Sequence, residues 1–281
     1  GAGRLGSIRI PFPAGRSEAL WEHMCAAALG VRRDDWSPQA VALMVNAMAA
    51  GGPPEPPRCA GARALLLHLV GLALALPPGA WLPQEVAMVA NGLSREGVEC
   101  GALLARLSEV VQAFPPAELD PLNVANIANA YARFRARDPA LMAHLAEAAL
   151  AAPPEAFSAQ AVSNILNAFG RVGARNATLF ARLAHVARQA PRAPTCLLLL
   201  PGSTPGALPT ATDNRHNRLQ PPQIPPAEFA PQNIGNLMNA MARSEVADAA
   251  LARHLAAAWA AQPPAEADAQ AICNVLHALA A

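Results

Sequence analysis

The chain has 281 residues, a mass of 29.1 kDa and a formal net charge of +1. Hydrophobic residues make up 53% of it, charged residues 15% and aromatic residues 4%; it contains 68 alanines and no lysine, so its 21 basic residues are all arginine. This composition excludes a strongly basic nucleic-acid-binding tail and an acidic disordered protein. Because alanine is the best helix former, it favours an all-α fold.

The cysteines and the longest apolar run argue against a disulfide-bonded, metal-binding or membrane-spanning protein. Five cysteines are widely spaced and form no CxxC pair, so neither a disulfide framework nor a metal site is expected, and a reducing compartment fits. The apolar run 65–76 is interrupted by His68 and is too short to cross a bilayer. We therefore expect no membrane insertion.

A ten-residue pattern recurs six times along the chain. Its first positions are Gln39, Gln84, Leu122, Gln160, Gln232 and Gln270. The intervals give a base period of 38 residues, with one insertion of 7 and one of 34. Counting from the first position as zero, leucines at +19 and +23, proline at +31 and Trp, Leu or Phe at +35 keep the same register.

Each unit predicts two antiparallel helices, A from 0 to +11 and B from +17 to a stop at the +31 proline. The fold expected is an all-α α-solenoid of about six 38-residue two-helix repeats, with a right-handed superhelix. We expect an N-terminal extension over residues 1–16 and the repeat array over 17–281. The chain opens within a B helix and closes just after an A helix, as a cut through a longer array would.

The 34-residue insertion, 191–226, is predicted to be one long Pro-rich loop. Loops of this length are usually functional or disordered. Two interpretations stay open: disorder in isolation, and docking on a partner.

The two faces of helix A differ in chemistry. Positions +2, +5, +6 and +9 form one apolar stripe, flanked by small residues at +3, +8 and +10 that allow neighbouring helices to approach closely. Positions 0, +4, +7 and +11 share the opposite face and hold mainly Gln, Asn, Asn and Arg. Stacked A helices would align these residues as a ladder of amides edged by arginines on a concave surface.

Amides can bind base edges and arginines can bind phosphates. The candidate RNA-binding residues are Arg95, Arg133, Arg171 and Arg243 at +11, Asn126, Asn164, Asn236 and Asn274 at +4, and Gln84, Gln160 and Gln232 at position 0. Position +4 varies, with Leu43 and Met88 in the first two repeats, and so suits base reading. The recurrent Asn at +7 is interpreted as mainly structural, satisfying backbone groups between helices. The arginines at +11 either contact phosphate or complement the helix dipole.

A further column at +22 on helix B is basic or potentially basic in every case. It comprises His23, His68, Arg106, His144, Arg182 and His254. We interpret it as a position at the flank of helix B, whose side chains have polar tips. The alternative is a second, weaker row of phosphate contacts.

The repeat resembles a known family. The pattern Gln-x-(Val/Ile)-(Ala/Ser)-Asn-(Ile/Leu)-x-x-Ala-(aromatic/Met)-(Ala/Gly), best matched by 123–133 and 161–171, resembles the octotricopeptide repeat and related helical repeats that are often found with RAP domains. The resemblance covers roughly 17–281 without the insertion. It implies an α-solenoid of mitochondria or chloroplasts that binds single-stranded RNA, guides its maturation or translation, or serves as an organellar ribosome subunit.

We therefore expect an organellar protein that binds RNA through the A helices, foremost as a structural subunit of a mitochondrial ribosome or other ribonucleoprotein. The expected partners are single-stranded or ribosomal RNA and protein subunits of that complex; the expected location is mitochondrial, with chloroplast as the alternative. A protein–protein scaffold without RNA contact and a free-standing RNA maturation or translation factor are the alternative functions. No Ser/His/Asp set, carboxylate pair or phosphate-cradling glycine loop stands at a meaningful spacing, so no enzyme, cofactor or metal is expected.

Overall fold

The computed structural model describes residues 16–51, 60–188, 228–244, 248–260, 262, 271–272 and 274–275. Within these residues every regular element is a helix, and no strand is found. The predicted all-α fold is thus confirmed. The chain divides into two compact units, Gly1–Phe114 and Pro115–Ala281, which we call unit 1 and unit 2 and describe separately.

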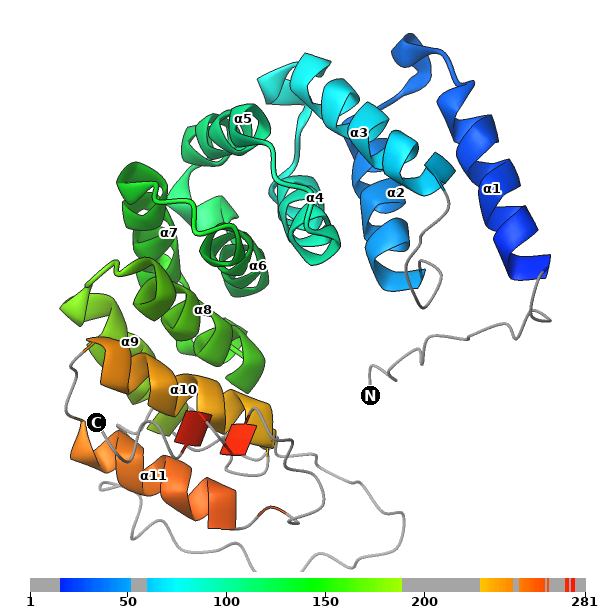
Figure 1. Ribbon diagram of the computed structural model, residues 1–281. Helices are drawn as coiled ribbons and strands as arrows, with labels where there is room; N and C mark the ends of the chain where they lie inside the picture. Colours follow the sequence, from blue (N-terminus) through cyan, green and yellow to red (C-terminus); the bar gives the residue numbers. More distant parts are fainter. Residues whose placement is uncertain are drawn as a thin grey trace, which may run out of the picture. The chain divides into compact units, whose positions relative to one another are not determined.

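Unit 1 contains two layers of helices (Figure 1). Its elements are α1 (Arg16–Leu29), η1 (Arg33–Asp35), α2 (Pro38–Gly51), α3 (Ala60–Ala75), η2 (Pro78–Ala80), α4 (Pro83–Glu96) and α5 (Gly101–Ala113). The A helices α2 and α4 pack side by side, and in the second layer α3 contacts both α1 and α5. The A–B alternation expected from the repeat is therefore present.

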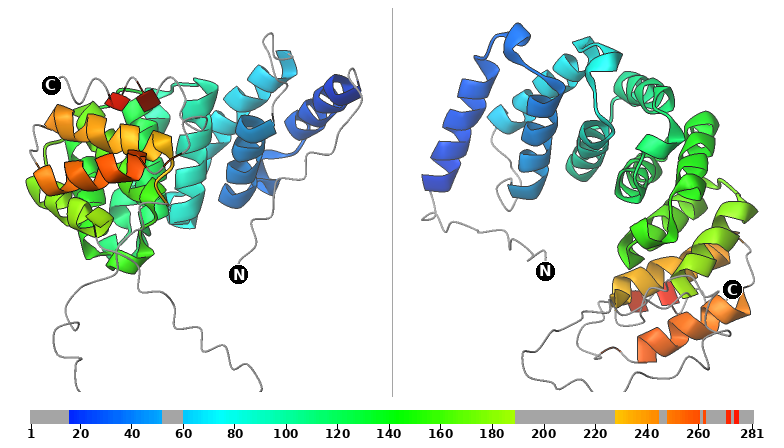
Figure 2. Two further views of the ribbon diagram at one scale, coloured as in Figure 1. Left: turned by 90° about the horizontal axis from the view of Figure 1, so that it is seen from below. Right: turned by 180° about the vertical axis from the view of Figure 1, so that it is seen from behind.

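Unit 2 repeats this arrangement (Figure 2). Its elements are η3 (Pro116–Glu118), α6 (Pro121–Arg133), α7 (Pro139–Ala151), η4 (Pro154–Ala156), α8 (Ala159–Val172), α9 (Ala177–Arg188), α10 (Pro231–Ser244) and α11 (Ala249–Ala260). The A helix α8 packs between α6 and α10, and α9 contacts α7 and α11 in the other layer. Residues 271, 272, 274 and 275, where the sixth A helix is predicted, are also helical.

The helices lie in the predicted registers, with ends that differ by up to three residues from the expected bounds. The helical, stacked architecture of an α-solenoid is confirmed within each unit. The handedness of the superhelix and the count of six repeats stay predictions. The insertion 191–226 and the extension up to residue 15 lie outside the described residues.

The core consists of the columns that define the repeat. The leucines at +19 and +23 are at most 1% exposed: Leu65, Leu69, Leu103, Leu107, Leu141, Leu145, Leu179, Leu183, Leu251 and Leu255. On helix A the apolar stripe is buried in the same way, for example at Val162, Ile165 and Phe169. Burial of both stripes between the layers is the main source of stability for such helices.

The turn before each A helix is more regular than the sequence indicates. Four of these turns form one turn of 3-10 helix, three of them beginning at a proline. Each turn seats the +35 side chain in the core, and these buried side chains are Trp36, Trp81, Leu119, Phe157 and Phe229. In unit 2 polar side chains then cap the helices, because Asp120 accepts from the amide of Asn123 at 2.7 Å and Ser158 from that of Ala161 at 3.1 Å.

Small residues let neighbouring A helices approach closely, as predicted. A Cβ added to Gly92 of α4 would lie 2.6 Å from Cγ1 of Val45 on α2. One added to Gly235 of α10 would lie 3.0 Å from the carbonyl oxygen of Ala271. Within each unit the polar faces of neighbouring A helices are thereby brought close together.

Candidate nucleic-acid interface

A groove of about 420 Å³ runs over the A helices of unit 2; we call it the amide groove. Its lining residues are Asn129, Arg133, Asn164, Asn167, Arg171, Gln232, Asn236, Asn239, Arg243 and Asn274. All ten occupy positions 0, +4, +7 or +11 of their repeats. Because these positions fall on one side of a helix, burial of the opposite apolar stripe turns them outward together.

The amides of this groove are largely unengaged within the described part of the chain. The side chains of Asn129, Asn164 and Asn236 form no hydrogen bond there, and Oδ1 of Asn167 is buried without a hydrogen-bond partner. In α10, by contrast, Oδ1 of Asn239 accepts from Nε of Arg243 at 3.3 Å. Among the hydrogen bonds of the described residues, none joins the side chain of Asn129, Asn167 or Asn239 to a backbone group of a neighbouring helix, and all three residues line the groove.

Arginines edge the groove at the carboxyl ends of α6, α8 and α10. None of the lining residues is acidic. Burial lowers the pKa of Arg171 below its ordinary value, and the nearby charges that lower it further are those of Arg133, Arg243 and Arg135. The guanidinium groups are thus close enough to repel one another, and an anion between them would relieve that repulsion.

The helix dipole alone does not account for where these arginines lie. A cation in the last turn is favourable in any helix. Among the A helices, α4, α6, α8 and α10 carry an arginine in the last turn and α2 carries no basic residue there. Among the B helices, α9 carries His185 and Arg188 in its last turn, and the last turns of α1, α3, α5, α7 and α11 hold no basic residue. Last-turn arginines are thus more frequent on the amide-bearing helices, which favours the phosphate-contact interpretation.

The structure brings together most of the sequence-predicted residues of unit 2. Arg133, Arg171, Arg243, Asn164, Asn236, Asn274 and Gln232 all line the amide groove. Asn126, half-buried on α6, and Gln160, exposed on α8, lie outside its lining. Gln84 and Arg95 belong to unit 1, where both are exposed on α4.

Five further residues were not among the predicted site residues. Asn129, Asn167 and Asn239 line the amide groove. Arg135 and Arg137, on the connection between α6 and α7, line a second hollow that shares Arg171 and Arg243 with it. The recurrent Asn at +7 is evident in the sequence, but because it is so uniform it was predicted to be mainly structural.

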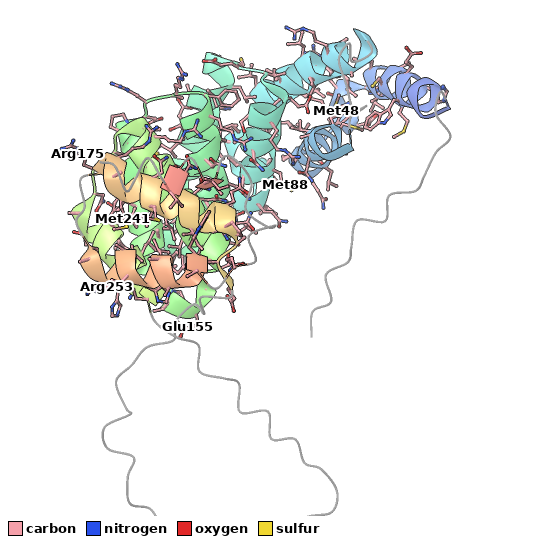
Figure 3. The ribbon with its side chains drawn as sticks, turned by 60° about the horizontal axis from the view of Figure 1, so that its bottom comes forward. Met48, Met88, Glu155, Arg175, Met241 and Arg253 are labelled. Atoms are coloured by element: carbon pink, nitrogen blue, oxygen red, sulfur yellow. The ribbon has the colours of Figure 1, made fainter. Side chains whose placement is uncertain are left out.

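The corresponding face of unit 1 is more apolar. At +4 of α2, Leu43 is 55% exposed. At +4 of α4 is Met88, which is labelled in Figure 3 and is half-buried. By contrast Met48, at +9 on α2, belongs to the buried stripe. The A-helix face therefore changes at +4 from apolar side chains in unit 1 to amides in unit 2.

Most of the +22 column is engaged in packing, which favours the flank interpretation, whereas His23 on α1 is exposed. Nε2 of His68, His144 and His254 and Nε of Arg106 are buried. The rings of His68 and His254 meet Trp36 and Phe229 edge to face, with centroids 6.4 and 6.0 Å apart. Nη2 of Arg182 donates to the carbonyl of Ala152 at 3.4 Å. His68, His254 and Arg182 thus pack their B helices onto the end of the preceding repeat.

The described ranges also bear on metal binding and on membrane insertion. No group of three or more His, Cys, Asp or Glu side chains there is placed to hold a metal ion. Among the helices of those ranges, none has the length and apolarity to span a bilayer.

No protein-family model matches the chain, and no curated protein is significantly similar to it. The geometry of the groove and the repeat pattern are therefore what indicates the function of the chain.

Proposed function

We propose that unit 2 binds single-stranded RNA along the amide groove. One observation supports this above all: a row of Asn and Gln side chains lines a groove that is edged by Arg133, Arg171 and Arg243 and has no acidic lining residue. The arginines would hold phosphates, and the amides would contact base edges.

The chemistry of the groove favours a single strand over a duplex. An A-form helix hides its base edges in a deep, narrow major groove, whereas bases of a single strand can be splayed out and hydrogen-bonded along their edges. A row of amides, each with donors and acceptors, suits such edges. Stacking of bases on the guanidinium planes of Arg171 and Arg243 would add affinity.

The same geometry supports a role inside a larger assembly. Three phosphate contacts give a modest electrostatic affinity. Protein contacts elsewhere would supply the rest, and Leu43 with Met88 offers unit 1 an apolar face for them. We therefore propose a structural subunit of a ribonucleoprotein; its placement in a mitochondrial ribosome, or in a chloroplast, follows from the octotricopeptide resemblance.

A protein-only scaffold is the second candidate, because exposed Leu43 suits an apolar partner segment. RNase treatment of the native complex separates the two. Release of the protein by RNase supports RNA contact, whereas retention favours the scaffold.

The direct test is fluorescence anisotropy with single-stranded and duplex RNA of one sequence. The whole chain should prefer the single strand. Replacing Arg133, Arg171 and Arg243 with alanine should weaken binding at least a hundredfold, since a hydrogen bond to a charged group contributes about 1.5–3 kcal/mol. A charge-matched control changes Arg32, Arg33 and Arg253, all exposed and outside the groove, to alanine. Equal losses in the two variants would contradict the proposal.

A further inference from the structure

The A helices α4, α6 and α8 end in the same hydrogen-bonded cap. In each, the amide at +14 donates to the carbonyl at +9: Val98 to Leu93, Ala136 to Tyr131, and Ala174 to Phe169, at 3.0–3.1 Å. This bond requires a left-handed residue at +13. That residue is Gly97 in α4 and Gly173 in α8, with φ of 66° and 72°.

In α6 the same position is held by Arg135, with φ of 53°. It is the one described non-glycine residue with positive φ. A residue with a Cβ is disfavoured there, which is why the neighbouring repeats use glycine. Backbone strain of this kind gathers at functional sites and persists only where something offsets it. The conformational preference of the helix cap therefore does not explain why this position holds an arginine.

Arg135 lies in a hollow of about 380 Å³ beside the amide groove, which we call the arginine hollow. Four arginines line it, Arg135, Arg137, Arg171 and Arg243, together with Ala132 and Val172. Arg135, Arg137 and Arg171 form no ion pair among the described residues. No lining residue of the hollow is acidic.

The number of charges exceeds what a regular strand requires. A backbone that crosses the A helices would meet one arginine per repeat, as the +11 row supplies. Arg135 and Arg137 add two more at a single connection, so positive charge is concentrated at one end of α6. An internal phosphodiester carries one negative charge, whereas a phosphomonoester carries nearly two at neutral pH and offers three acceptor oxygens.

We propose that the arginine hollow binds the terminal phosphomonoester of the strand that occupies the amide groove. Arg135 and Arg137 are specificity residues for that end, while Arg171 and Arg243 are shared with the phosphodiester path. This proposal rests on the proposed function, because it assigns an end to the same bound strand. Either a 5′ or a 3′ phosphate meets the chemical requirement.

The test uses one single-stranded RNA sequence in three forms: with a 5′ phosphate, with a 3′ phosphate, and with hydroxyl groups at both ends. One phosphorylated form should bind the whole chain about tenfold more tightly than the hydroxyl form, the factor expected from one further charge-assisted hydrogen bond. Arg135→Gly and Arg137→Ala should each abolish that preference and leave binding of the hydroxyl form within about twofold.

Thermal unfolding supplies the matching control. Arg135→Gly should have a Tm equal to or above that of the wild type, because glycine relieves the left-handed strain. Loss of the phosphate preference in a variant of undiminished stability cannot come from misfolding. Arg253→Ala, on α11 outside the hollow, should retain the preference.

The possible failures are distinguishable. If the hydroxyl strand binds and depends on Arg133, Arg171 and Arg243, yet a terminal phosphate gives no advantage, the hollow proposal is overturned and the proposed function stands. An advantage that survives in Arg135→Gly also overturns it. If no RNA binds in any form, the proposed function fails, and with it the assignment of the hollow to a strand end.

Discussion

Arg243 donates from Nε to Oδ1 of Asn239, one helical turn earlier on α10, at 3.3 Å. In α8 the equivalent oxygen, Oδ1 of Asn167, is buried and has no hydrogen-bond partner. Two asparagines at the same repeat position therefore differ in what they do for the folded protein. Substitutions at these two asparagines can therefore test whether the amides stabilise the fold or bind a ligand.

Asn167→Ala should leave the free energy of unfolding unchanged or raise it slightly, because the buried oxygen that it removes has no partner. Asn239→Ala should cost about 0.5–1.5 kcal/mol, the contribution of one lost hydrogen bond. Both should weaken RNA binding. Denaturant unfolding together with RNA titration checks this. If Asn167→Ala lowers the free energy of unfolding by more than about 1 kcal/mol and leaves RNA binding unchanged, the amides have a structural role.

The close approach of α2 and α4 in unit 1 predicts opposite effects of alanine at two glycines. Gly92→Ala would bring its Cβ to 2.6 Å from Cγ1 of Val45 and 3.2 Å from the Val45 carbonyl oxygen, so we expect a loss of about 1–3 kcal/mol. Gly71 of α3 has nothing within 4 Å of an added Cβ. Gly71→Ala should therefore stabilise the helix by about 0.5–1 kcal/mol. Thermal unfolding of both variants gives the answer, and equal shifts of Tm would refute the packing described for α4.

Asp248 joins two helices of unit 2. Its carboxylate accepts from the amides of Ala250 and Leu251 at the start of α11 and forms a salt bridge with Arg188 at the end of α9. Asp248→Ala removes both functions and should cost about 2 kcal/mol. Asp248→Asn keeps an oxygen for the cap and should cost roughly half as much. If the two variants are equally stable, the salt bridge contributes nothing.

His254 should make unit 2 sensitive to mild acid. Burial lowers the pKa of its imidazole, and the charge of Arg188 lowers it further. The folded chain thus binds this proton less readily than the unfolded chain does. Stability is fully present above the unfolded pKa of about 6.5 and is lost as the pH falls below it. His254→Phe, which keeps a ring against Phe229, should flatten the decline of Tm between pH 7.5 and 5.5; an unchanged slope would exclude His254 as its origin.

The repeat period determined most of what could be predicted. Columns at fixed offsets place each helix, because the apolar stripes must face each other and the +31 prolines must end the B helices. The boundary between the two units at Phe114 and Pro115 has no counterpart in the pattern, since the register runs through it unchanged. The spacing of residues predicts which side chains share a helix face. It does not predict where the contacts between helices divide the chain into two units.

The candidate site was predicted less fully than the fold. Uniform Asn at +7 was interpreted as structure, yet Asn129 and Asn167 face the amide groove. Arg135 was not among the predicted site residues. The sequence does contain a signal for it, because position +13 is glycine at Gly97 and Gly173 and arginine in the repeat between them. That an arginine adopts the left-handed conformation there required the backbone itself.

The salt dependence of RNA binding tests the central claim most directly. Each phosphate contact on a single strand contributes about −0.7 to the slope of log K against log salt concentration. The wild-type chain should give a slope of about −2 or steeper with a strand that has hydroxyl ends. Changing Arg133, Arg171 and Arg243 to alanine should make the slope shallower by about 2, whereas the charge-matched change of Arg32, Arg33 and Arg253 should leave it as in the wild type. Equal slopes for all three proteins would contradict RNA binding in the amide groove.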